Sequence, residues 1–190
     1  MLTETEIIKL GNGEYFNKSN KIGNGVTGIV YKINDKYVVK KFKYNTYYAH
    51  FRKELEATIL LSNFSISPKV VYHSNPKVKS KYFVMQRLDH TLYNMLKNRI
   101  FTEYHLFKLE IIINKLNKTK YIHTDLHLNN IMWSEHYKQF YIIDWGYYSI
   151  SKIHLQKNNY KFVIKTSKYW MYNSKKIYKF FGCIIFRIVL

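Results

Sequence analysis

The sequence predicts an α+β fold of two lobes, because strand-like segments fill its first half and helical patterns surround a polar loop in its second. Runs rich in β-branched and aromatic residues alternate with turn residues in the first half. Strands are therefore expected at 29–33, 37–42, 70–72 and 82–85. In the second half, apolar residues three and four positions apart from Leu106 to Leu116 predict one face of a longer helix.

Local signals predict the remaining elements. Thr3 and Glu6 have the spacing of a capping box, which predicts a short helix from Thr3 to Leu10. Apolar residues at every fourth position predict a second helix over residues 50–63. A short helix at 91–97 and a short strand at 141–143 complete the expected elements.

Composition bounds the class of protein. With 47% hydrophobic residues, a chain of 190 residues can bury a substantial core. Its 31 Lys and Arg against 12 Asp and Glu give a net charge of +19, which predicts attraction to polyanions such as RNA. The lysines are spread along the whole chain, however. This favours an AT-rich coding sequence over a dedicated nucleic-acid interface as the source of the charge.

Cysteine content and hydropathy point to a reducing compartment. The single Cys183 excludes an internal disulfide and a cysteine-based zinc site, so we expect a cytoplasmic protein. Residues 1–9 carry two glutamates and predict no secretory leader. The apolar segment 177–190 has 14 residues and contains Lys179 and Arg187, which favours a buried helix or strand over a membrane span.

The most informative passage is a polar loop followed by a short apolar strand. Asp125 is followed five residues later by Asn130, and Asp144 ends the next apolar strand. Phosphoryl-transfer sites use this spacing, with one Asp orienting the attacking hydroxyl and the Asn and second Asp holding a metal ion. The sequence therefore predicts a phosphoryl-transfer site formed by these three side chains.

A glycine-rich segment, residues 22–30, precedes the predicted strands. Its Gly-x-Gly-x-x-Gly pattern leads from Gly28 into a hairpin and not into a helix, so a Rossmann dinucleotide site is excluded. A glycine-rich hairpin tip instead lets backbone N–H groups approach phosphate oxygens. Val30 is then expected to cover the adenine ring.

Lys40 ends the strand that follows this hairpin. A lysine flanked by buried positions needs an acidic partner, and the next helix supplies Glu54 and Glu56. We expect Glu56 to be the partner, because Ile59 and Leu60 would then lie where the helix packs beneath the sheet. Lys41 is expected on the opposite face of the strand.

From Ile22 to Gly146 the order of these motifs resembles that of the protein-kinase-like superfamily. The resemblance implies a two-lobed kinase-like fold with an N-terminal extension (1–20), a β-rich N-lobe and hinge (21–88), and a shortened, mainly helical C-lobe with a basic tail (89–190). It further implies that Asp125 is the catalytic base and that Asn130 and Asp144 bind Mg²⁺ or Mn²⁺.

The same resemblance implies an ATP site. Lys40 and Glu56 would form the strand–helix ion pair, Met85 would be the gatekeeper, and His123 would anchor the catalytic loop. The backbone of the hinge, residues 86–88, would bond adenine. The residues implied in cofactor binding are Ile22, Gly23, Asn24, Gly25, Val26, Thr27, Gly28, Val30, Lys40, Glu56, Met85, Gln86 and Leu88.

Several positions depart from the typical kinase pattern. Thr124 replaces the Arg that usually precedes the catalytic Asp, so control by loop phosphorylation is not expected. His127 stands where typical Ser/Thr kinases carry a Lys, and Trp145 replaces the Phe of the metal-binding motif. After Asp144 the chain has 46 residues with nine Lys or Arg and no acidic residue, which is too short for a standard C-lobe.

Three functions remain open. The first is a minimal Ser/Thr protein kinase, similar to the small kinases linked to tRNA modification or encoded by large DNA viruses, in which case host cytoplasm or virion is expected. The second is a small-molecule kinase of the aminoglycoside or choline type, which Asp125-Leu126-His127 resembles. The third is an ATP- or RNA-binding pseudokinase whose basic tail, with Tyr169 and Trp170, contacts RNA. Acidic protein substrates are expected from the net charge.

Overall fold

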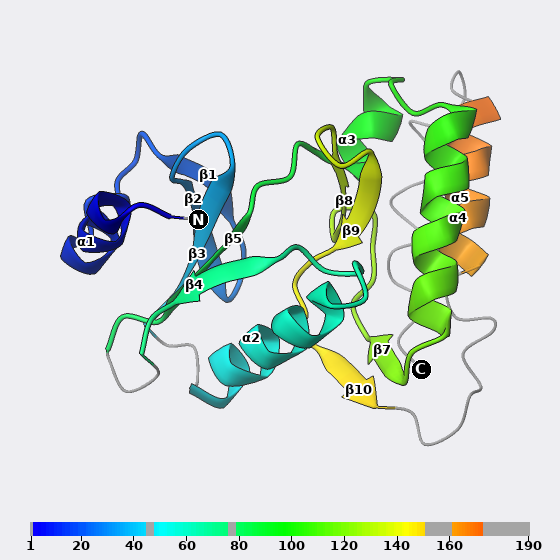
Figure 1. Ribbon diagram of the computed structural model, residues 1–190. Helices are drawn as coiled ribbons and strands as arrows, with labels where there is room; N and C mark the ends of the chain where they lie inside the picture. Colours follow the sequence, from blue (N-terminus) through cyan, green and yellow to red (C-terminus); the bar gives the residue numbers. More distant parts are fainter. Residues whose placement is uncertain (1, 45–47, 76–78, 151–160, 173–190) are drawn as a thin grey trace.

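A computed structural model describes residues 2–44, 48–75, 79–150 and 161–172 (Figure 1). The first half of the chain forms a five-stranded antiparallel sheet with one helix on each side. The second half combines helices with two small sheets. The predicted α+β class is confirmed.

The large sheet has the strand order β1-β2-β3-β5-β4. Its strands are β1 (Lys21–Asn24), β2 (Gly28–Lys32), β3 (Tyr37–Phe42), β4 (Val70–His73) and β5 (Tyr82–Gln86). Four of the five match strands predicted from β-branched and aromatic runs. The fifth, β1, lies in the segment that was predicted only as a glycine-rich loop.

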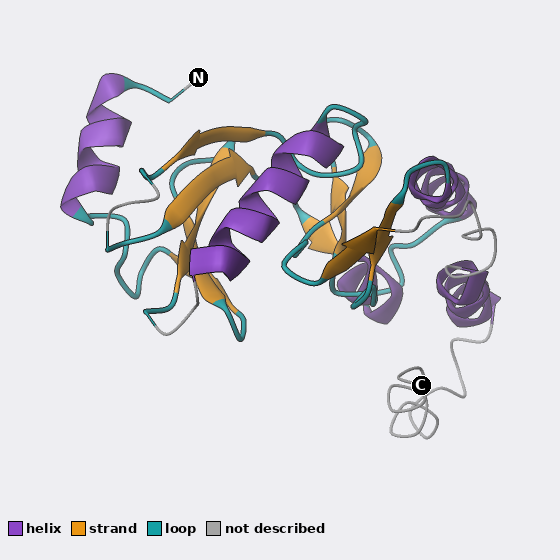
Figure 2. Cartoon of the chain, turned by 90° about the horizontal axis from the view of Figure 1, so that it is seen from below, coloured by secondary structure: helices purple, strands orange, loops and turns teal. Residues whose placement is uncertain are grey.

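The two faces of this sheet pack against different helices. Helix α1 (Glu4–Asn12) begins with the predicted capping box of Thr3 and Glu6 and buries Leu10 against Tyr31 and Val39. Helix α2 (Tyr48–Ser62) lies across the other face, as Figure 2 shows, and buries Phe51 against Phe83. The N-terminal segment is therefore packed against the large sheet.

The second half of the chain contains three described helices. These are α3 (Leu92–Lys97), α4 (Glu103–Asn117) and α5 (Lys161–Tyr172). The predicted apolar face of α4, from Leu106 to Leu116, is buried and joins Trp133 and Phe140 in the largest core cluster. Helix α5 runs beside α4 and adds Val163 to the same core.

Two small antiparallel sheets lie between α4 and the large sheet. One has the order β6-β8-β9, formed by His90–Thr91, Ile131–Ser134 and Gln139–Ile142. The other pairs β7 (Tyr121–His123) with β10 (Tyr148–Ile150). Because β7 precedes the polar loop and β10 follows Asp144, this pairing holds the two motif segments side by side.

The predicted orientation of α2 is wrong. Ile59 and Leu60 are 40% and 38% exposed, whereas Glu54 and Leu55 are buried with Leu61. Phe51 and Leu55 of the predicted apolar stripe are buried, but Thr58 lies on the buried face in place of Ile59.

Two predictions concern the basic tail: the role of its aromatic residues and the structure of segment 177–190. The described residues test only the first of them, and only in part. Within α5, Tyr169 is 48% exposed, so its ring is not packed into the core. The side chain of Trp170 and the segment 177–190 lie outside the described part of the chain. Among the described residues, no helix has the length and apolar character needed to cross a membrane.

Candidate active site

Lys40 lies at the centre of the candidate site. Its Nζ donates to Glu54 Oε1 of α2 and to Asp144 Oδ1 of the segment after β9, the second bond measuring 2.9 Å. The side chain is only 10% exposed. One ammonium thus connects the sheet, its covering helix and the second half of the chain.

The predicted partner of Lys40, Glu56, is wrong. Glu54 is the residue that forms the ion pair, whereas Glu56 is exposed and pairs with Arg52 at 2.6 Å. The cause is the helix register, since residues two positions apart on a helix do not share a face. Glu54 lies on the same side of α2 as the buried Phe51 and Leu61 and therefore points at the sheet.

The electrostatics of this cluster follow from its burial. Burial acts to lower the pKa of Lys40, but the carboxylates of Glu54 and Asp144 outweigh it and the pKa is raised. Burial acts to raise the pKa of Asp144, but the Lys40 ammonium brings it below its ordinary value. Glu54 is fully buried, and the loss of solvent raises its pKa to about 7.

His50 is a member of the site that sequence reasoning missed. It lies one turn before Glu54 on α2, with its Nε2 3.9 Å from Glu54 Oε2. Neither atom has a hydrogen-bond partner within the described part of the chain. A Cβ on Gly146 would lie 2.3 Å from His50 Nε2, so the glycine is needed for this helix to approach Asp144 closely. Its position four residues before Glu54 could have indicated from the sequence that the two side chains lie on the same face of α2.

The polar loop, residues 123–130, is fixed by its own hydrogen bonds. His123 Nδ1 accepts from the backbone N–H of Asp125, so Nε2 carries the proton and donates to the carbonyl of Ile143 at 2.9 Å. Burial lowers the pKa of His123, in keeping with this neutral form. Asn130 Nδ2 donates to the carbonyl of Asp125 at 3.0 Å. His123 therefore anchors the loop, as predicted.

Asp144 is held by its neighbours on both sides. The backbone N–H of Ile143 donates to the carbonyl of Asn130 at 2.9 Å, which places the two predicted metal ligands in adjacent segments. Trp145 is fully buried, and its indole N–H donates to the carbonyl of Ile142. Asp144 itself has φ +63°, a left-handed conformation that Asp tolerates better than most residues.

The glycine-rich segment forms a hairpin beside Lys40. Gly25 at its tip donates its N–H to the carbonyl of Gly28 at 2.9 Å. A Cβ on Gly28 would lie 2.9 Å from the carbonyl O of Lys41 and 3.3 Å from Lys40 Cε, so glycine is required there. The exposed tip leaves Val26 almost fully accessible.

The register of the strands places Val30 and Met85 on the same face of the sheet as Lys40. Val30 pairs with Lys40, and Met85 pairs with Val38, two residues before Lys40. Directly paired residues share a face, and so do residues two apart on one strand. Val30, Lys40 and Met85 therefore lie on the face that α2 covers. Lys41 lies on the other, with its Nζ 4.1 Å from the centre of the Phe16 ring.

The predicted hinge follows β5 and links the halves of the chain. Gln86 ends β5, and the backbone N–H of Arg87 donates to the carbonyl of Lys36. Beyond Leu88, the N–H of Asp89 donates to the carbonyl of Trp133 in β8. The segment is thus bonded to the large sheet at one end and to the second half at the other.

Asn130 and Asp144 supply the donor atoms that Mg²⁺ prefers. The amide nitrogen of Asn130 is engaged by Asp125, which leaves its Oδ1 as an oxygen ligand. Asp144 uses Oδ1 for Lys40 and retains Oδ2. Two protein oxygens suit a Mg²⁺ ion that takes its other ligands from phosphates and water. No group of three His, Cys, Asp or Glu among the described residues forms an all-protein metal site.

Comparisons with known proteins leave the family of the chain undetermined. No protein-family model matches it, and a search of curated proteins found no match. The functional argument therefore rests on the geometry of the site.

The Lys40–Glu54 pair predicts a large difference between two neighbouring glutamates. Glu54→Ala should lower the free energy of unfolding at pH 5 by about 3 kcal/mol, because it removes a buried hydrogen-bond partner of Lys40 and leaves a cavity. Glu56→Ala is the matched control and should change it by less than about 0.5 kcal/mol, because its ion pair is exposed. Urea denaturation measures both. Equal losses in the two variants would contradict the assigned pairing.

The raised pKa of Glu54 predicts a pH-dependent stability. The folded state holds the Glu54 proton up to about pH 7, whereas the unfolded chain releases it near pH 4.5. Stability contributed by Glu54 is therefore fully present below pH 4.5 and is lost as pH rises to about 7.

The stability of the wild type relative to Glu54→Gln should fall by about 3 kcal/mol across this window. Urea denaturation of both proteins at a series of pH values measures the difference. A constant difference would show that the pKa of Glu54 is not raised.

Proposed function

We propose that the chain has a protein-kinase-like fold and catalyses ATP-dependent phosphoryl transfer to a Ser or Thr hydroxyl of a protein. The observation that carries the proposal is the Lys40 ammonium held between Glu54 and Asp144. An ammonium has three N–H donors, and two of them are used by these carboxylates. The third remains for a phosphate oxygen.

The surroundings of Lys40 support a nucleotide as the ligand. The glycine hairpin lies beside it, where backbone N–H groups can approach phosphates without side-chain obstruction. Val30 and Met85 share its face of the sheet and offer apolar contacts for a base. The hinge, residues 86–88, follows directly after Met85 and carries the backbone groups that would bond adenine.

Asn130 Oδ1 and Asp144 Oδ2 would hold Mg²⁺ or Mn²⁺, which neutralises charge on the phosphates. The protein residues have the remaining roles. Lys40 positions the phosphates, and Glu54 positions Lys40. Asp125, whose carboxylate is exposed at the start of the loop, orients the acceptor hydroxyl and takes its proton as the new O–P bond forms.

Catalysis in such a site depends mainly on position and charge. The loop that carries Asp125 is bonded to the segment of Asp144 through His123 and Asn130. Acceptor and phosphate are thereby held in a fixed relation, which reduces the entropic part of the barrier.

A small-molecule acceptor is the second candidate, and His127 favours it. The ring accepts the N–H of Asn129 at Nδ1, which leaves the proton on Nε2, 3.8 Å from Asp125 Oδ2. The Asp125-Leu126-His127 sequence resembles that of aminoglycoside and choline kinases. The net charge of +19 favours acidic acceptors in either case.

A transfer assay tests the proposal. Purified protein is incubated with γ-labelled ATP and Mg²⁺, together with acidic proteins, basic proteins or small alcohols as acceptors. Asp125→Asn should lower the transfer rate at least about a hundredfold, because it removes the base, while nucleotide binding stays unchanged. Glu14→Gln is the control and should keep the wild-type rate, because Glu14 is exposed directly after α1, which packs on the face of the sheet opposite Lys40.

The possible outcomes separate the candidates. Label on protein that is lost only in Asp125→Asn supports a protein kinase. Label only on small alcohols selects the second candidate. Transfer at the wild-type rate by Asp125→Asn contradicts the assigned base, and absence of transfer to any acceptor contradicts the proposed activity.

A further inference from the structure

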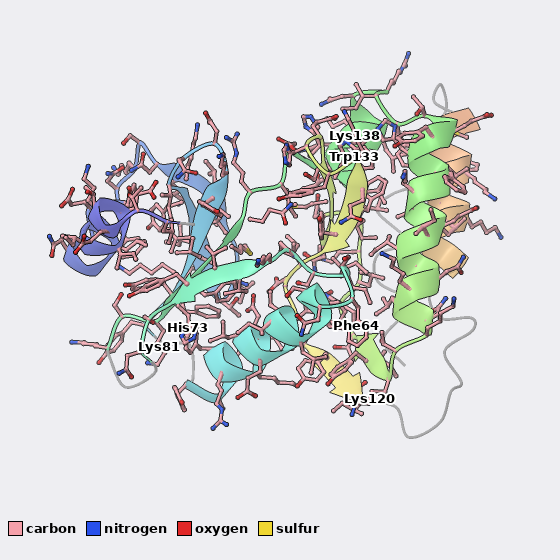
Figure 3. All side chains as sticks on the ribbon, in the orientation of Figure 1. Phe64, His73, Lys81, Lys120, Trp133 and Lys138 are labelled. Atoms are coloured by element: carbon pink, nitrogen blue, oxygen red, sulfur yellow. The ribbon has the colours of Figure 1, made fainter. Side chains whose placement is uncertain are left out.

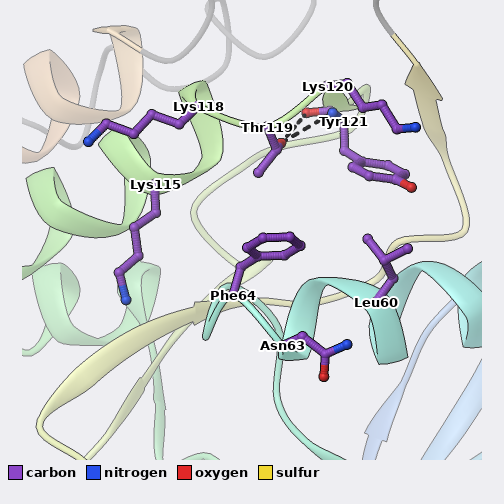
Figure 4. Close-up of a pocket in the computed structure, with 8 residues that line it drawn as sticks. All are labelled: Leu60, Asn63, Phe64, Lys115, Lys118, Thr119, Lys120 and Tyr121. Carbon is purple, nitrogen blue, oxygen red and sulfur yellow. Dashed lines mark hydrogen bonds between the residues drawn. The ribbon is translucent and has the colours of Figure 1, made fainter.

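A concave surface lies away from the Lys40 site, with none of the residues of that site in its lining. It is a cavity of about 740 Å³ between the end of α2, the end of α4 and the start of β7 (Figure 4). Leu60, Phe64 and Tyr121 provide its apolar lining. Lys115, Lys118 and Lys120 surround the Phe64 ring, and their amines point outward (Figure 4). We call these six residues the lysine-rimmed pocket.

The backbone holds Phe64 in an exposed position. Ser65 has φ +54°, which reverses the chain directly after α2, and the N–H groups of both Phe64 and Ile66 donate to the carbonyl of Leu61. Ile66 is fully buried by this turn, whereas Phe64 is 56% exposed. Figure 3 shows Phe64 and Lys120 on the same side of the molecule. A large ring fixed outside the core is available to a partner without rearrangement.

The three lysines at the rim are uncompensated. Within the described part of the chain, none of their amines forms an ion pair with a carboxylate. Other lysines of the molecule do find such partners, as Lys138 does with Glu135 and Lys168 with Glu110. The rim is therefore a local concentration of positive charge without carboxylate partners among the described residues, in which Lys120 Nζ lies 5.8 Å from the centre of the Tyr121 ring.

The pocket continues along α4. Tyr104, Phe107 and Ile111 are exposed on this helix. At 100° per residue they share one face with Lys115, which lines the pocket. An exposed apolar stripe about two turns long thus runs from the first turn of α4 towards the pocket. Several exposed apolar side chains on one helix face are typical of a protein interaction site.

Charge selects the class of occupant. A second copy of this chain carries a net charge of +19 and would be repelled by the lysine rim. The segment 145–190 of the same chain has no acidic residue and so cannot neutralise it. An acidic segment of another protein with bulky apolar side chains can both pair with the three lysines and contact the apolar lining.

We propose that the lysine-rimmed pocket and the adjoining face of α4 form a docking site for an acidic, amphipathic segment of a partner protein. A bulky apolar side chain of the segment fills the cavity against Phe64, and its carboxylates pair with Lys115, Lys118 and Lys120. The aliphatic Leu60 in the lining favours a peptide side chain over a stacked nucleobase. This interaction goes beyond the proposed phosphoryl transfer and does not depend on it.

Peptide selection tests the docking site. Random peptides displayed on phage are selected on the folded, full-length chain, and the strongest binder is measured by fluorescence anisotropy. The selected sequences should combine Asp or Glu with Phe, Leu, Ile or Trp. Phe64→Ala should weaken binding at least about tenfold, because it removes the central apolar contact. Circular dichroism checks that this exposed substitution leaves the fold intact.

A pair of charge variants separates local from general electrostatics. Simultaneous replacement of Lys115, Lys118 and Lys120 by Glu should weaken peptide binding at least about tenfold. The matched control replaces three exposed lysines elsewhere, Lys18, Lys36 and Lys69, and should retain binding within about twofold, because the net charge changes equally.

Four results would overturn the proposal. They are the absence of enriched peptides, enriched peptides without acidic or apolar residues, equal losses in the two charge variants, and unchanged binding by Phe64→Ala. A labelled single-stranded oligouridine is tested in parallel. Oligouridine binding that depends on Phe64, in the absence of peptide binding, would identify a nucleic-acid site instead.

Discussion

The burial of the Lys40 ammonium is the constraint on which the arrangement of the molecule depends. An isolated buried charge is very costly, so Lys40 must be paired for the fold to form. Its two partners come from α2 and from the segment after β9. Pairing therefore fixes the rotation of α2 and the approach of the second half of the chain together. In the proposed function the same contacts hold the ammonium for a phosphate, so that one group would meet both the structural and the functional requirement.

The fully buried Glu54 makes the stability of this arrangement dependent on pH. Burial raises its pKa to about 7, and its second oxygen faces His50 without a hydrogen bond. Buried polar atoms without partners are costly and concentrate at functional sites. Gly146 allows this close approach, which explains why a glycine follows Asp144 by two residues. Helix α2 and the Asp144 segment thus form one coupled unit.

Much of the fold could be predicted from the sequence, because short-range patterns determine it. The strand β3, the capping box of Thr3 and the buried face of α4 all follow from local spacing. The partner of Lys40 was predicted wrongly, because the apolar Ile59 and Leu60 are exposed and Glu54 shares the buried face of α2 with Phe51. The pairing of β7 with β10 was also missed, because it depends on contacts between segments that are distant in the sequence. The lysine-rimmed pocket likewise forms only when α2 and α4 meet.

Isothermal titration of ATP in the presence of Mg²⁺ tests the central role of Lys40 most directly. The wild type should bind, and Lys40→Met should weaken binding at least about tenfold, because it removes a charged hydrogen bond to the phosphates. Lys41→Met is the matched control, since its ammonium lies over Phe16 on the opposite face of the same strand. It should bind as the wild type does. Equal affinity of all three proteins, or no binding by any of them, would contradict the assignment of this cluster as a nucleotide site.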